Sequence, residues 1–200
     1  MGLETFINFY LKIFFILTPF FVLSAFLSLT RGFQDSEKKQ VAIKVTIAVM
    51  ISSFVIYLFG KYIFDLFGIT MDAFRIGAGT ILFLSALSMI SDSSDTASQG
   101  NNRDIAVVPL ALPMTVGPGV IGVLLVMGAE AASYTEKFII GAALFFAVVT
   151  VGIILYLSSS VKRLIGEQGL VILPKVTGLF VSAIAAQIIF TGIQNFLKAN

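Results

Sequence analysis

The segment spanning residues 104–126 is apolar and long enough to cross a lipid bilayer, but it cannot be a regular helix throughout. Pro109, Pro113 and Pro118 each lack a backbone N–H, and each proline ring crowds the preceding helical turn. In hydrocarbon the freed carbonyls need other partners, so an interrupted backbone is tolerated only beside protein or a water-filled cavity. The segment therefore predicts a membrane span that is broken at a binding site.

The triplet Gly117-Pro118-Gly119 is the centre of this prediction. A single proline would be better explained by a kinked packing helix, because Pro and Gly are commoner in membrane helices than in soluble ones. Three prolines with two flanking glycines favour a functional site instead. The kinked packing helix stays open as the alternative interpretation.

The composition places the chain among integral membrane proteins. Of its 200 residues 58% are hydrophobic and 12% are charged, and the mean hydropathy is +1.00. Cysteine and histidine are both absent, which excludes disulfides, thiolate or imidazole metal sites and His-dependent triads. We expect no metal, no cofactor and, since the basic residues lie in short joints, no nucleic-acid partner.

Six apolar segments predict an all-α polytopic membrane protein with six transmembrane helices embedded in the lipid bilayer. They cover approximately residues 6–29, 41–64, 73–90, 105–127, 138–158 and 176–197. Polar joints are expected between them, including residues 60–72 and 159–175. The most polar joint, residues 91–104, separates a first half (1–90) from a second half (105–200), each with three spans.

Basic residues are unevenly distributed between the two predicted sides of the membrane. The joints after the first, third and fifth spans, with their flanks, hold Arg31, Lys38, Lys39, Lys44, Arg103, Lys162, Arg163 and Lys175. The opposite side holds Lys12, Lys61, Arg75, Lys137 and Lys198. The positive-inside rule therefore predicts that both termini are extracytoplasmic.

A weak internal repeat relates the two halves. Aligning Pro19 with Pro113 places Ser24 opposite Pro118, and residues 75–79 resemble residues 175–179. Because each half has an odd number of spans, a duplicated half enters the membrane in the opposite sense. This predicts two inverted three-helix repeats with interrupted helices one and four and a substrate site between them. Chance similarity among apolar segments is the alternative.

The chain resembles the MarC family of bacterial and archaeal inner-membrane proteins. The resemblance rests first on Pro109-Leu-Ala-Leu-Pro-Met-Thr-Val-Gly-Pro-Gly119, and also on residues 26–30, 75–79, 177–187 and 191–192. It implies a multi-pass protein of the bacterial inner membrane. Because the family includes carriers of glycine and alanine, the resemblance also implies transport of a small neutral amino acid.

The first span departs from the family pattern, which resembles Asn-Pro-x-Gly-x-x-Pro. This chain keeps Pro19 but has Thr18 for the Asn, Phe21 for the Gly and Ser24 for the second Pro. The hydroxyls of Thr18 and Ser24 can still bond a small zwitterion or a freed carbonyl.

The candidate site residues are those that can present backbone dipoles, hydroxyls or an amide near the predicted breaks. Broken helices offer amides to a carboxylate and carbonyls to an ammonium, and glycine lets the backbone approach a small ligand. Gln187 has an equally good explanation as an interhelical hydrogen-bonding residue. The predicted substrate-binding set is Thr18, Pro19, Ser24, Pro113, Thr115, Gly117, Pro118, Gly119 and Gln187.

A secondary transporter working by alternating access is the function that these features favour. A membrane channel or a non-transporting structural or regulatory subunit are the alternatives, and an enzyme is not expected because the intramembrane hydroxyls lack a base at the same depth. Asp72 and Arg75, one turn apart, are expected to pair near a membrane surface. The coupling ion, proton or sodium, and a homo-oligomeric state stay open.

Overall fold

The computed structural model describes residues 2–91, 115–131 and 133–198, and these residues form helices and no strand. In chain order the described helices are α1 (Gly2–Ile16), α2 (Pro19–Leu29), α3 (Asp35–Phe67), α4 (Met71–Ile90), α5 (Pro118–Glu130), α6 (Tyr134–Tyr156) and α7 (Ser158–Lys198). The prediction of an all-α protein is confirmed.

Five segments of the described chain are long and apolar enough to cross a membrane: Gly2–Leu29, Asp35–Gly60, Met71–Ile90, Tyr134–Tyr156 and Ser158–Lys198. The first combines α1 and α2, which are consecutive pieces of one span. The helix α5 has 13 residues, which is too short to cross alone. The remainder of the fourth predicted span, with Pro109, Pro113 and most of the 91–104 joint, lies outside the described residues.

Two of the expected polar joints are largely helical in the structure. The helix α3 continues to Phe67, and α7 runs through the expected joint at residues 159–175 with a break at Gly166 (φ 69°, ψ 177°). A helix satisfies its own backbone hydrogen bonds, so it can continue beyond the apolar part of a span without a turn. Polarity therefore marked where the lipid-facing part ends and not where the helix ends.

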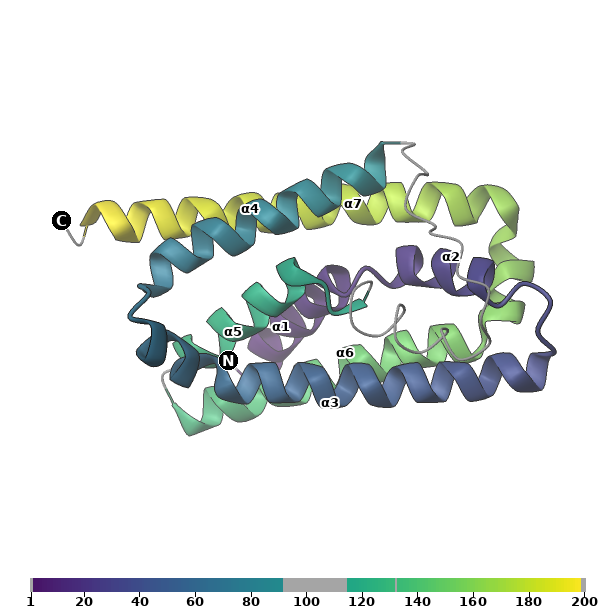
Figure 1. The fold of residues 1–200 in the computed structure, drawn as a ribbon, viewed down its shortest axis with the longest axis horizontal. Helices are drawn as coiled ribbons and strands as arrows, with labels where there is room; N and C mark the ends of the chain where they lie inside the picture. Colours follow the sequence, from purple (N-terminus) through teal and green to yellow (C-terminus); the bar gives the residue numbers. More distant parts are fainter. Residues whose placement is uncertain (1, 92–114, 132, 199–200) are drawn as a thin grey trace.

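The helices lie side by side along the long axis of the molecule (Figure 1). The pair α4 and α7 forms one side, α3 and α6 form the opposite side, and α1, α2 and α5 lie between the two pairs. Both termini lie toward the same end of the bundle. We call this end the terminal end and the other the loop end.

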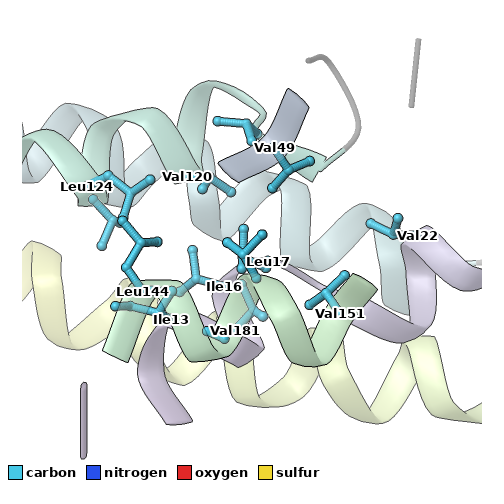
Figure 2. Close-up of a cluster of buried hydrophobic side chains, with 14 of the residues drawn as sticks. Ile13, Ile16, Leu17, Val22, Val49, Val120, Leu124, Leu144, Val151 and Val181 are labelled. Atoms are coloured by element: carbon cyan, nitrogen blue, oxygen red, sulfur yellow. The ribbon is translucent and has the colours of Figure 1, made fainter. Parts of the chain in front are cut away.

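The core surrounds the junction between α1 and α2. Leu17 at this junction is fully buried (0% exposed), and the same cluster contains Ile13 of α1, Val120 of α5, Leu144 of α6 and other buried side chains (Figure 2). The interruption of the first span is thus located within the packed interior of the bundle.

Glycines allow α5 to approach its neighbours closely. A β-carbon at Gly119 would lie 2.9 Å from Cα of Leu82 in α4, and one at Gly128 would overlap the carbonyl oxygen of Tyr57 in α3. The α4–α7 contact is similar, since a β-carbon at Gly178 would lie 2.9 Å from the carbonyl oxygen of Ala86. These contacts hold α3, α4, α5 and α7 together at backbone distance.

Candidate substrate site

The first span is interrupted where the sequence predicts it. The helix α1 ends at Ile16 and α2 begins at Pro19, and Thr18 between them adopts the left-handed conformation (φ 48°, ψ 56°). The amide of Thr18 donates to the Phe15 carbonyl at 3.0 Å, and the Thr18 carbonyl accepts from the amide of Val22 at 3.0 Å. The Thr18 side chain makes no capping hydrogen bond to α2.

The second break precedes α5. Gly117 has an extended backbone (φ −71°, ψ 173°), and Pro118 is the first residue of the helix. Gly117 has no side chain that could cap this N-terminus, and Thr18 makes no capping hydrogen bond to α2. The first N–H groups of a helix have no partner within it and carry a partial positive charge. Both half-helices therefore begin with a proline and with amides directed at whatever lies before them.

Apolar side chains fill the space around the two breaks. Leu17 and Val116 are each 0% exposed, and Thr115 is 1% exposed. Pro19 and Gly119 are buried, Thr18 and Gly117 are half-buried, and Pro118 is exposed. The space beside Gly119 is occupied by Leu82 of α4, so this glycine serves helix packing in the structure. Pro113 lies outside the described residues.

Ser24 bonds a carbonyl that a proline leaves without its helical donor. The Oγ of Ser24 donates to the Leu170 carbonyl of α7 at 3.0 Å. In a regular helix that carbonyl accepts from the amide four residues later, but the residue there is Pro174, which has no N–H. Ser24 therefore holds α2 against α7 and satisfies the backbone of α7 at the same point.

A partly enclosed cavity of about 140 Å³ lies between α1, α4, α5 and α7. Gln187 is the predicted site residue that lines it. The other lining residues are Phe9, Lys12, Arg75, Val123, Val126, Met127, Glu130, Ile188 and Thr191. Because α4 begins and α5 ends toward the terminal end of the bundle (Figure 1), Arg75 and Glu130 place the cavity in that part of the molecule.

An ion-pair network forms one wall of the cavity. Arg75 pairs with Asp72 of its own helix, as the sequence predicts, and with Glu130 of α5. The Arg75 side chain is 13% exposed, and Nδ2 of Asn195 in α7 donates at 3.4 Å to Asp72 Oδ1, the same oxygen that Arg75 contacts. Among the described residues no group of three or more His, Cys, Asp or Glu side chains could hold a metal ion.

Sequence reasoning missed Lys12 and Glu130 as cavity residues. Lys12 was counted only among the basic residues on the side of the termini, and Glu130 was not singled out. The useful signal was that Lys12 lies well inside the first apolar run, where charge is costly unless it is paired or faces water. The position of Lys12 within the first span therefore indicates a polar cavity at the same depth, and it does so more directly than the position of Gln187.

Comparison with known proteins places the chain in a family without assigning it an activity. Residues 3–197 match the MarC family of integral membrane proteins. An UPF0056 membrane protein of Methanocaldococcus jannaschii is 34% identical over 98% of this chain and 100% of its own length. The relatives from Aquifex aeolicus and Escherichia coli are 27% and 29% identical, and the matches cover 96% and 94% of this chain and 94% and 92% of the relatives.

No solved structure matches the chain. The family match covers nearly all of the 200 residues. It agrees with the five candidate membrane spans of the described chain. The chain therefore belongs to the MarC family of integral membrane proteins.

Proposed function

We propose that this protein is a secondary transporter of small neutral amino acids that works by alternating access. The observation that carries the proposal is the pair of half-helices α2 and α5, which both begin with a proline inside the bundle and whose N-cap residues, Thr18 and Gly117, make no side-chain cap. The two half-helices run toward opposite ends of the molecule (Figure 1). Membrane proteins tolerate such interruptions where the free backbone groups line a cavity or a site.

The chemistry of the breaks suits an amino-acid zwitterion. The amides at the start of α2 and α5 can donate to a carboxylate, and the carbonyls at the end of α1 can accept from an ammonium. Neither interaction requires a charged side chain. Thr18, Pro19, Gly117 and Pro118 are the residues that we assign to the central site, with Thr115 beside them.

The arrangement of helices supports two inverted halves. In such a pair α3 corresponds to α6 and α4 to α7, while α2 corresponds to α5. The contacts α3 with α5 and α2 with α6 are then equivalent, as are α4 with α5 and α2 with α7. This correspondence pairs Pro19 with Pro118, the first residues of α2 and α5, and so differs from the alignment of Pro19 with Pro113 that the sequence suggests.

The structure corresponds to one state of the transport cycle. Buried Leu17, Val116 and Val120 close the central region, whereas the cavity lined by Lys12 and Glu130 lies toward the terminal end. With basic residues such as Arg31, Lys38 and Lys162 on the loop end, the positive-inside rule makes the terminal end extracytoplasmic. We therefore assign the state an outward orientation in a bacterial inner membrane.

Uptake into liposomes tests the proposal. The purified protein is reconstituted, and entry of labelled glycine, alanine and serine is followed with and without proton or sodium gradients. We expect saturable uptake, with loss of uptake in Gly117→Leu because the new side chain fills the break. Gly77→Leu is the matched control, since nothing lies within 4 Å of a β-carbon there. A folded protein that moves none of these solutes would refute the proposal.

A further inference from the structure

We propose that the cavity between α1, α4, α5 and α7 recognises both charges of the transported solute. In this assignment Lys12 binds the carboxylate and Glu130 binds the ammonium group. The inference deepens the transporter function proposed above and rests on it. It adds a side-chain site on the terminal side of the two helix breaks, where the solute binds on its way to or from the centre.

Lys12 supplies the positive charge. It lies in α1, is half-buried, and lines the cavity. Among the described residues no carboxylate forms a salt bridge with its ammonium group, in contrast to Lys38 and Lys162, which pair with Asp35 and Glu167. An ammonium group at this position has donors to offer to an entering carboxylate.

Glu130 supplies the negative charge in a fixed position. Its carboxylate pairs with Arg75, which is held in turn by Asp72 of the same helix. A carboxylate has two oxygens and about four lone-pair directions, so one guanidinium contact leaves acceptor capacity toward the cavity. Arg75 is thus a positioning residue that orients Glu130.

The charges of the cavity wall balance without a ligand. Lys12, Arg75 and Glu130 line the cavity, and Asp72, which pairs with Arg75 outside the lining, supplies the second negative charge. A zwitterion preserves this balance because each of its ends meets an opposite charge. A solute with one charge would leave either Lys12 or Glu130 without a compensating group, which is costly in a partly buried site.

The size and polar groups of the cavity fit a small amino acid. Its volume of about 140 Å³ is close to that of an engineered cavity that binds benzene, a molecule of about six non-hydrogen atoms. Alanine has a similar number of atoms. Gln187 offers a side-chain amide with donors and an acceptor. The Thr191 hydroxyl donates to the backbone carbonyl of Gln187 at 2.8 Å and keeps an acceptor lone pair.

Equilibrium binding to the full-length protein in lipid nanodiscs tests the assignment. Titrations of wild type use alanine, propionate, which lacks the amine, and ethylamine, which lacks the carboxylate. We expect binding of alanine and at least about tenfold weaker binding of each single-charge analogue, because a charge-assisted hydrogen bond is lost. Propionate or ethylamine binding as tightly as alanine would overturn the assignment.

Variants show whether the two named side chains are responsible. Lys12→Met and Glu130→Gln are expected to weaken alanine binding by at least about tenfold, whereas Lys12→Arg restores most of it. Lys198→Met, at the exposed end of α7, is the matched control for loss of a lysine. Each variant is first checked for folding by a monodisperse size-exclusion profile. If Glu130→Gln does not fold, the assignment is tested with Lys12→Met.

The outcomes separate this inference from the transporter proposal. Unchanged alanine affinity in Lys12→Met, with wild type transporting alanine, would overturn the charge-recognition site and leave the transporter function standing. Wild type that neither binds nor transports any small amino acid would refute both.

Discussion

At the scale of single residues, the most informative contact is the one between Ser24 and the Leu170 carbonyl. The 3.0 Å bond supplies a donor at the point where Pro174 removes one from α7. A proline inside a membrane helix is tolerated when a neighbouring side chain satisfies the freed carbonyl. The serine and the proline therefore depend on each other although 150 positions separate them in the sequence.

Ser24→Ala tests this dependence. Removing the hydroxyl leaves the Leu170 carbonyl without a donor, so we expect a loss of about 1–3 kcal/mol in unfolding free energy, measured by thermal unfolding in detergent. In the Pro174→Ala background the new amide restores the helical bond, and the same serine substitution should cost clearly less. An equal loss in both backgrounds would show that Ser24 acts in another way.

Thr18 carries backbone strain. Its left-handed conformation (φ 48°) is unusual for a β-branched residue and costs about 1–2 kcal/mol. Asn tolerates this region better. We therefore expect Thr18→Asn to raise the unfolding free energy by about 1 kcal/mol in detergent. Thr18→Val, which keeps the branched β-carbon, is the control, and a wild-type stability in Thr18→Asn would contradict the account.

At the scale of elements, α5 is held by backbone contacts that leave no room for side chains. A β-carbon at Gly128 would overlap the Tyr57 carbonyl oxygen of α3, which cannot move without shifting the helix. Such contacts are typical of helices in membranes, where close backbone approach replaces the hydrophobic effect as the source of association. In the proposed transport cycle, α5 can therefore move only if α3 moves with it.

Gly128→Ala and Gly77→Ala should have opposite effects on stability. Both replace a helical glycine by a better helix former, which by itself stabilises by about 1 kcal/mol. Gly77 has nothing within 4 Å of the new methyl group, so its variant should be neutral or stabilised. Gly128→Ala should unfold at a lower temperature because α3 and α5 must separate. Equal behaviour of the two variants would exclude a backbone contact at Gly128.

The sequence predicted where helices begin better than it predicted which residues line the cavity. Prolines at positions 19 and 118 determine helix starts in any environment, and α2 and α5 begin at those residues. The extension of α3 and α7 into polar sequence was missed because polarity reports the membrane boundary. Gly119 was expected to belong to the substrate site, and the structure places Leu82 of α4 beside it; the sequence could not predict this contact because it does not reveal which neighbour a glycine approaches. Lys12 and Glu130 line the same cavity only because helices distant in the sequence pack together.

At the scale of the whole molecule, the two ends of the bundle carry different charges. Arg31, Lys39 and Lys162 lie near the ends of helices that meet at the loop end, and both termini lie toward the other (Figure 1). The chain contains no cysteine, so a single introduced cysteine reports its own side of the membrane. This makes the predicted orientation directly measurable.

We expect Gly2→Cys and Lys198→Cys to react with a membrane-impermeant maleimide added to intact cells, because both termini are assigned to the extracytoplasmic side. Gly32→Cys should react only after the cells are opened. All three positions are exposed in the structure, so exposure is matched. Labelling of Gly32→Cys in intact cells, with no labelling of Gly2→Cys or Lys198→Cys, would show that the orientation is the opposite of the predicted one.

Solute counterflow measures alternating access most directly. Liposomes containing the protein are loaded with excess unlabelled alanine and diluted into a trace of labelled alanine. A carrier that exposes one site to each side in turn must accumulate label above its external concentration for a time, and we expect this overshoot. A channel would let the label equilibrate without an overshoot, and that result, or no entry of label at all, would contradict the account.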